Sequence, residues 1–389
     1  MKTEAAIIGA GPAGLITARE LALNGINATV FEEHIKIGEP NHCAGILSIE
    51  GLKRLGIKPH ADFIQQEIVG GTLYSPSGTG ISIKSNRPRA YIVNRGAFDR
   101  HLSEAASDDG AELRTGCRIE NLQNHEEIVK AGLVIDAEGV KGIVAGGMGF
   151  PKPSGIISGI NVEVSSIELE EGMVEVWFGD KFSPGFFIWV TPSGDGTARC
   201  GLGCNTGDPW VNLKKFLDKR FKTYEAGPPA RWPILTEGPI DKTYGEKILL
   251  VGDVAGQVKP TTGGGVIMGG ICALESAKTA IKALESGNTS AEYLKNYDDS
   301  WRAKLGKEFT TMLQARRIAN RISDARMNRL FDATKKAGLE ETAEKLINEG
   351  DMDMQSKIIR KALTTPSFIR VGVSAFGRVL LNEFLTILG

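Results

Sequence analysis

A glycine-rich turn near the start of the chain constrains the fold more than any other feature. The buried-looking apolar run Ala5–Ile8 leads into a Gly-x-Gly-x-x-Gly turn made by Gly9, Gly11 and Gly14, and a helical segment continues to about Asn24. A strand, a glycine turn and a helix in this order are typical of a site for the pyrophosphate of a dinucleotide. The sequence therefore predicts such a site at the first turn.

Each residue of this turn has an expected role. Gly9 permits the tight turn, Gly11 lets the backbone approach a pyrophosphate, and Gly14 allows the helix to pack on the strand. The first helical residues are Pro12 and Ala13, where unsatisfied backbone N–H groups point at the anion. A glycine loop that only serves helix packing is the alternative.

The next strand is expected over residues 28–31, and it is followed directly by Glu32 and Glu33. An acidic side chain at this position accepts hydrogen bonds from ribose hydroxyls in dinucleotide-binding folds. We therefore place both glutamates in the predicted cofactor site.

Two later segments extend the site. A buried strand ends in Gly252 and Asp253, whose carboxylate can meet further sugar-like hydroxyls. A second glycine loop then begins a helix that runs to about Glu285, and its bare backbone and positive end would stabilise negative charge on a flat heterocycle. The residues of this loop are Gly263, Gly264, Gly265 and Val266. FAD has the pyrophosphate, the polyol and the reducible ring that the three segments together require.

Composition excludes several classes of protein. The chain has 389 residues and a formal net charge of −1, which argues against a dedicated nucleic-acid binder. Its five cysteines are scattered, so we expect reduced thiols in a cytoplasmic protein, with no disulfide framework and no metal cluster. The first strand begins too early for a signal peptide, and we find no apolar window of about 18 residues that would predict a transmembrane helix.

The element pattern predicts an α/β fold in three parts. We expect a Rossmann-like FAD-binding domain with inserted strands at about 65–93, an inserted antiparallel β-sheet domain that binds the substrate, and a C-terminal helical region. The expected bounds are 1–153 and 246–288 for the FAD-binding domain, 154–245 for the substrate domain and 289–389 for the helical region.

Residues 94–99 (Asn-Arg-Gly-Ala-Phe-Asp) resemble the Arg-x-x-Phe-Asp element of flavoproteins that include p-hydroxybenzoate-hydroxylase-like monooxygenases and geranylgeranyl reductases. The resemblance covers roughly residues 1–290. It implies that Arg95 lies near the phosphate and ribitol of FAD and that the backbone at Ile119 meets the adenine. At residue 138 the chain has Glu where many members have Asp before Gly139.

Two stretches indicate the geranylgeranyl reductase branch. Residues 184–192 are similar to its Pro-x-x-Tyr-x-Trp-x-Phe-Pro signature, with Phe187 in place of Tyr and Thr191 in place of Phe. Residues 42–45 are similar to a Cys-Ala loop at the flavin, which implies that Cys43 and Ala44 lie there.

The resemblance implies hydride transfer from reduced flavin to an isolated C=C bond, with a proton delivered to the other carbon. Phe187 and Trp189 point to the same side of a strand, so they and Trp177 are candidates to line the substrate cavity and to ease cationic character. Cys43 is a candidate for a proton or positioning role. The alternatives are an ordinary sheet core for the aromatic residues and a loop thiol that only packs on the flavin.

We therefore expect an FAD-dependent reductase of polyprenyl chains, on an archaeal-type glycerophospholipid. Only one dinucleotide fingerprint is present, so an external donor of NAD(P)H, ferredoxin or deazaflavin type must supply electrons. A flavin monooxygenase of an aromatic substrate and a non-catalytic prenyl carrier are the rival hypotheses. The basic and apolar C-terminal region is expected to cap the substrate domain, to contact the inner face of the cell membrane, or both; its residues are Arg316, Arg317, Arg321, Arg326, Arg329, Phe368, Ile369, Val371, Val379, Leu380, Leu381, Phe384 and Leu385.

Overall fold

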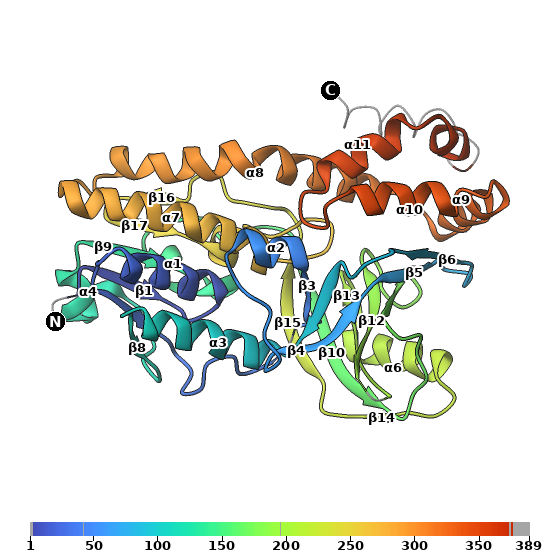
Figure 1. The fold of residues 1–389 in the computed structure, drawn as a ribbon, viewed down its shortest axis with the longest axis horizontal. Helices are drawn as coiled ribbons and strands as arrows, with labels where there is room; N and C mark the ends of the chain where they lie inside the picture. The colour runs from blue at the N-terminus through green and yellow to red at the C-terminus, as the bar shows by residue number, and fades with distance from the viewer. Residues whose placement is uncertain (1–2, 42, 195, 373–374, 376–389) are drawn as a thin grey trace.

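The computed structural model describes residues 3–41, 43–194, 196–372 and 375. Two lobes lie side by side, and a layer of helices extends along one side of both (Figure 1). The first lobe contains the glycine turn, and the second contains the large antiparallel sheet. His42 and residues 379, 380, 381, 384 and 385 of the predicted apolar end lie outside the described residues.

A six-stranded sheet forms the centre of the first lobe. Its order is β16-β17-β9-β1-β2-β8, and β1 pairs in parallel with both β2 and β9. Every residue of β1, β2 and β9 is buried, as expected for parallel strands whose two faces are covered by helices. The bounds are Tyr244–Gly245, Ile248–Leu250, Leu133–Asp136, Ala5–Ile8, Ala28–Phe31 and Glu112–Arg114 in that order.

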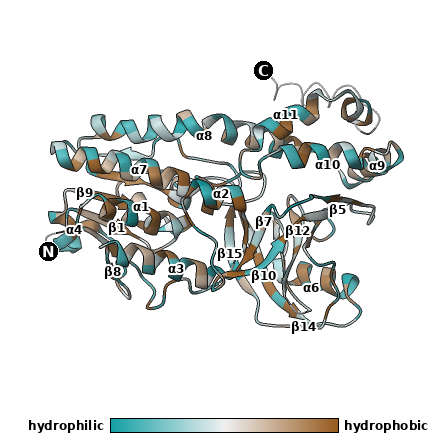
Figure 2. Cartoon of the chain, viewed as in Figure 1, coloured by the Kyte–Doolittle hydropathy of each residue, from teal (hydrophilic) through white to brown (hydrophobic). Residues whose placement is uncertain are grey.

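Helices cover this sheet, and α7 packs along α1 and α8. Hydrophobic residues are concentrated on β1 and α7, whereas α8 mixes both kinds of residue (Figure 2). The helix α7 ends at Gly287, which has a φ of 65° and the left-handed geometry of a C-terminal cap, as the sequence predicted. The helices of this lobe are α1 (Pro12–Leu23), α2 (Ile49–Arg54), α3 (Arg95–Asp108), α4 (Glu126–Lys130), α5 (Ile143–Gly147), α7 (Val266–Ser286) and α8 (Ala291–Ala319).

An eight-stranded sheet forms the second lobe. Its order is β14-β10-β13-β12-β11-β5-β6, and β15 also pairs with β10. The helix α6 (Pro209–Arg220) buries Leu213, Phe216 and Leu217 in a cluster with apolar residues of β10, β12 and β13. The strands are Glu225–Ala226, Ile156–Ser165, Thr197–Cys204, Phe187–Gly194, Met173–Phe178, Gly70–Tyr74, Gly80–Lys84 and, for β15, Ala230–Leu235.

The strands predicted at about 65–93 divide between two sheets. β4 (Ile64–Ile68) and β7 (Ala90–Val93) form a small sheet with β3 (Ile46–Ser48). β5 and β6 instead extend the large sheet, because β5 pairs in parallel with β11. Pairing therefore joins residues on both sides of the expected domain boundary at 153, and that boundary stays a prediction.

The described residues after α8 include the helices α9, α10 and α11; α9 and α10 lie over β6 at the edge of the second sheet, whereas α11 packs against α8 and α10 (Figure 1). Phe331 of α9 packs with Ile81 and Ile83 of β6. The described part of the C-terminal region is therefore helical and contacts the second lobe. These helices are α9 (Asp324–Lys336), α10 (Glu340–Glu349) and α11 (Ser356–Thr364). Within the described residues, none of the helices combines the length and apolarity needed to span a bilayer.

Candidate active site

The three glycines of the first turn differ in the space around them. A Cβ at Gly9 would lie 2.5 Å from the carbonyl oxygen of Ala137, and a Cβ at Gly14 would collide with the carbonyl oxygen of Gly9. A Cβ at Gly11 would meet nothing within 4 Å. Gly9 and Gly14 are thus needed by the fold itself, whereas Gly11 borders open space where a ligand can approach the backbone.

The two predicted glutamates have different surroundings. The Glu32 carboxylate accepts a 2.7 Å hydrogen bond from the backbone N–H of Ala10, so it lies against the glycine turn. Glu33 is bonded to Lys141, which lowers the pKa of Glu33. The structure therefore places Glu32 at the turn and leaves Glu33 in an ion pair beside it.

Arg95 and Asp253 lie close enough to influence each other. Arg95 makes two 3.0 Å hydrogen bonds to the Asp99 carboxylate. Burial lowers the pKa of Arg95, but the negative charge of Asp99 opposes this effect, and the pKa is raised overall. The protein around Asp253 removes part of the hydration of its carboxylate and so raises its pKa, and the positive charge of Arg95 partly opposes this rise. The residue is still open to solvent, so it can meet a ligand.

The second glycine loop joins the two lobes. A Cβ at Gly265 would lie 2.6 Å from Oδ1 of Asp253, and a Cβ at Gly263 would collide with the side chain of Ile234 in β15. Gly265 is the N-terminal cap of α7, and no side chain caps this helix or α1. Their first N–H groups therefore remain available to a ligand.

These features fit FAD. Open space at Gly11 and the uncapped start of α1 suit a pyrophosphate, the exposed Asp253 suits the polyol, and the uncapped start of α7 suits the pole of the ring that becomes negative on reduction. Ile119 is buried beside Phe31 in the core of the first lobe. Gly252 has a φ of 80° and packs against Ala13, which brings the end of β17 to the start of α1.

The Cys-Ala loop lies against the second sheet. Asn161 donates a 3.4 Å hydrogen bond to the carbonyl of Cys43, and Arg199 donates a 3.1 Å bond to the carbonyl of Ala44. The N–H of Gly45 points at the Cys43 sulfur, 3.4 Å away. Polar groups of β10 and β13 thus hold this loop in place.

An aromatic cluster adjoins the loop; we define it as Phe186, Phe187, Trp189 and Trp232. The rings of Phe186 and Phe187 stack at 4.2 Å, and the Phe187 and Trp189 centroids are 6.1 Å apart. Ile157 and Ile234 complete the cluster, and Ala44 packs against it. The structure therefore brings Phe187, Trp189 and Ala44 together, and Ile234 connects them to Gly263 of the second glycine loop.

One hydrogen bond connects the aromatic cluster to the Cys-Ala loop. The Trp189 indole donates a 3.2 Å bond to the side-chain oxygen of Asn161, whose amide holds Cys43. Neither Asn161 nor Arg199 was predicted as a site residue. Both are polar residues within otherwise apolar strands, a pattern that could have marked them as candidates. The pattern does not show which loop such a residue contacts.

Trp177 lies elsewhere. It pairs in register with Ile188, so its side chain is on the sheet face opposite to Phe187 and Trp189. Its ring stacks on Tyr74 at 3.8 Å, and its indole donates a 2.7 Å hydrogen bond to Glu175. The structure does not bring Trp177 to the cavity wall that the sequence suggested, because the register of β11 against β12 pairs Trp177 with Ile188 rather than with Phe187 or Trp189.

Glu138, where Asp is common in similar flavoproteins, has a structural role. Its carboxylate accepts hydrogen bonds of 2.8, 2.8 and 3.1 Å from the backbone N–H groups of residues 143, 144 and 145, at the start of α5. The extra methylene of Glu lets the carboxylate reach this helix end.

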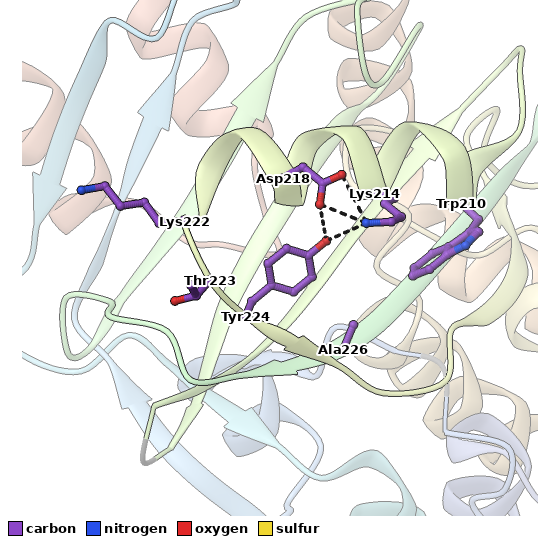
Figure 3. Close-up of a pocket in the computed structure, with 7 residues that line it drawn as sticks. All are labelled: Trp210, Lys214, Asp218, Lys222, Thr223, Tyr224 and Ala226. Atoms are coloured by element: carbon purple, nitrogen blue, oxygen red, sulfur yellow. Dashed lines mark hydrogen bonds and ion pairs between the residues drawn. The ribbon is translucent and has the colours of Figure 1, made fainter.

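A surface concavity of about 410 Å³ lies beside α6. Figure 3 shows that Lys214, Asp218 and Tyr224 point toward one another in it. The Tyr224 hydroxyl donates a 2.7 Å hydrogen bond to Asp218, and Lys214 bonds the same carboxylate at 3.0 Å. These polar groups satisfy each other, and the concavity shares no residue with the cofactor site.

Comparison with known proteins identifies the family to which this chain is related. The model of the FAD binding domain family matches residues 2–194. Digeranylgeranylglycerophospholipid reductase 2 of Methanothermobacter thermautotrophicus is 31% identical over 354 residues, which cover 85% of this chain and 91% of that protein. Digeranylgeranylglycerophospholipid reductase of Methanocaldococcus jannaschii is 31% identical over 351 residues, which cover 84% of this chain and 89% of that protein.

Solved structures share the fold. A geranylgeranyl bacteriochlorophyll reductase-like protein of Thermoplasma acidophilum aligns with a TM-score of 0.82 and 20% identity, over 99% of this chain and 98% of that one. The halogenase PltM in complex with phloroglucinol and FAD aligns with a TM-score of 0.64 and 14% identity, over 100% of this chain and 97% of that one.

The sequence match extends over both lobes. The cofactor is FAD. This chain therefore belongs to the geranylgeranyl reductase family of FAD-dependent oxidoreductases.

Proposed function

We propose that this protein saturates C=C bonds in the polyprenyl chains of a membrane glycerophospholipid. The observation that carries the proposal is the close approach of the second glycine loop to the aromatic cluster, where Gly263 abuts Ile234. This contact supports an apolar, aromatic wall beside the proposed position of the flavin ring. The names of the archaeal relatives support the class of substrate.

When bound and reduced, FAD supplies a hydride equivalent. The chain has to hold the alkene beside it, to exclude water and to deliver a proton to the second carbon, so that the double bond gains one hydride and one proton. The faces of Phe187 and Trp189 suit the first two tasks and ease positive charge on the alkene. We propose the half-buried Cys43 thiol as the proton donor, since its loop contacts the same cluster.

The test is anaerobic turnover. Protein reduced with dithionite is incubated with digeranylgeranylglycerophospholipid in detergent, and the lipids are examined by mass spectrometry. We expect a gain of H₂ for each saturated bond. A product that requires O₂ would instead indicate a monooxygenase. Bound lipid without any gain in mass would indicate a carrier.

We further propose that the protein contacts the inner membrane face peripherally through its basic C-terminal region, and that an external donor reduces the flavin. Clustered arginines near a surface attract anionic lipid, and salt weakens this attraction. We expect the full chain to sediment with vesicles containing anionic lipid at low salt and to be released at high salt. Equal sedimentation with neutral vesicles would contradict this electrostatic contribution.

A further inference from the structure

Arg316, near the end of α8, is a buried cation beside the aromatic cluster. Arg316 is only 7% exposed, and its guanidinium lies 4.6 Å from the centre of the Phe186 ring. One terminal nitrogen donates a 2.7 Å hydrogen bond to the carbonyl of Gly185. The Nε–H has no hydrogen-bond partner within the described part of the chain.

The charge of Arg316 has weak compensation. Glu237 acts on it electrostatically, but that carboxylate is 2.8 Å from the neighbouring Arg317. Burial lowers the pKa of Arg316 to about 10, and Glu237 opposes this fall, so the side chain is still a cation at neutral pH. A buried cation with an unsatisfied donor is costly unless an anion meets it.

The position of Arg316 relates this charge to the substrate. Phe186 contacts Arg316 on one side and stacks on Phe187 on the other, and Phe187 contacts Trp189. Trp189 is bonded through Asn161 to the Cys-Ala loop. A continuous series of side-chain contacts thus runs from Arg316 through the aromatic cluster to the Cys-Ala loop.

We propose that Arg316 binds the phosphate at the head of a polyprenyl substrate whose chain lies along Phe186, Phe187 and Trp189. The planar guanidinium fork matches phosphate oxygens better than an ammonium does. This inference deepens the proposed function and rests on it. A polyprenyl diphosphate and a phospholipid offer the same chemistry, and the experiment separates them.

The experiment measures binding to oxidised, FAD-loaded protein by calorimetry, so it requires no turnover. The ligands are geranylgeranyl diphosphate, uncharged geranylgeraniol and digeranylgeranylglycerophospholipid in neutral detergent. We compare the wild type with Arg316→Met, Arg316→Lys and Arg87→Met. The last variant removes one exposed positive charge between β6 and β7, outside the basic C-terminal region, and serves as the control for net charge.

We expect Arg316→Met to weaken binding of a phosphate-bearing ligand about tenfold or more, as loss of a charge-assisted hydrogen bond does, without changing geranylgeraniol binding. The affinity of Arg316→Lys should lie between those of the wild type and Arg316→Met, and Arg87→Met should match the wild type. An effect on the diphosphate alone identifies a diphosphate head, and an effect on the phospholipid alone identifies a phosphodiester.

Equal weakening of all three ligands by Arg316→Met would make Arg316 a structural residue and overturn the inference. Unchanged binding of the phosphate-bearing ligands by this variant would also overturn it. So would a wild-type protein that binds neither phosphate-bearing ligand. If Arg316→Met weakens only the phosphate-bearing ligands but the wild type saturates neither of them, the proposed function is contradicted and the phosphate site is retained.

Discussion

The ammonium of Lys259 lies 2.8 Å from the carboxylate of Asp353, and their side chains are only 14% and 1% exposed. Asp353 also accepts a hydrogen bond from Ser48, which caps α2. Lys259 and Thr261 precede the second glycine loop, and Thr261 donates a 2.7 Å hydrogen bond to Gln355. The segment between α10 and α11 therefore braces the chain that leads into this loop.

Asp353→Ala should lower the free energy of unfolding by about 3–5 kcal/mol, because it leaves the Lys259 charge buried without its partner. It should also weaken FAD binding, since the loop loses its brace. Urea denaturation and titration with FAD measure the two effects. Glu349→Ala, which removes an exposed pair with Lys361, is the matched control and should change neither. Equal effects of both substitutions would refute the bracing role.

Alanine substitutions at two glycines of the first turn should have different effects on folding and on cofactor binding. Gly11→Ala adds a methyl group in open space at an ordinary φ of −75°, so the apoprotein should melt as the wild type does while FAD binding is lost or greatly weakened. Gly14→Ala should destabilise the apoprotein, because its Cβ collides with Gly9. Thermal melts without cofactor, followed by FAD titration, test both expectations. Normal FAD affinity in Gly11→Ala would place the pyrophosphate elsewhere.

Asp136 should make stability depend on pH. Burial and the neighbouring Glu138 raise the pKa of Asp136 well above its usual value, and its Oδ2 has no hydrogen-bond partner within the described residues. A raised pKa in the folded state stabilises the fold below the unfolded pKa of about 3.9, and this stability is lost as pH rises toward the folded pKa. Each unit of the shift corresponds to about 1.4 kcal/mol.

The corresponding test is denaturation with urea between about pH 4 and pH 8, for the wild type and Asp136→Asn. The free energy of unfolding should fall more steeply with pH in the wild type, since Asn cannot ionise. Parallel curves would show that Asp136 titrates alike in both states.

Trp189→Phe should loosen the Cys-Ala loop. The substitution keeps an aromatic ring but removes the indole N–H that orients Asn161. We expect faster alkylation of Cys43, measured by peptide mass spectrometry. Trp177→Phe removes an indole bond to Glu175 on the other sheet face and should leave the alkylation rate of Cys43 unchanged. The same rate in all three proteins would mean that Asn161 holds the loop without help from Trp189.

Short sequence patterns predicted the features that are determined by neighbouring residues in the chain. The order of β1, the glycine turn and α1, and the Gly287 cap of α7, each follow from residues within one or two turns of chain. The pairing of Lys259 with Asp353 crosses 94 residues, and nothing in either segment specifies the partner. The sheet face on which Trp177 lies could not be predicted either, because it depends on the register between β11 and β12.

Alternation of apolar and polar residues identifies a strand but not the sheet to which it belongs. Residues 70–84 therefore read correctly as strands, yet their pairing with β11 depends on a chain segment about a hundred residues later.

That pairing sets a rule for recombining this chain with its relatives. A graft of residues 154–245 alone would bring a foreign β11 against a resident β5, and Gly70 and Gly71 sit so close to Met173 and Val174 that mismatched side chains would split the sheet. A working chimera needs two coordinated inserts, the hairpin of residues 70–84 together with the middle segment, so the second lobe is inherited as a discontinuous module.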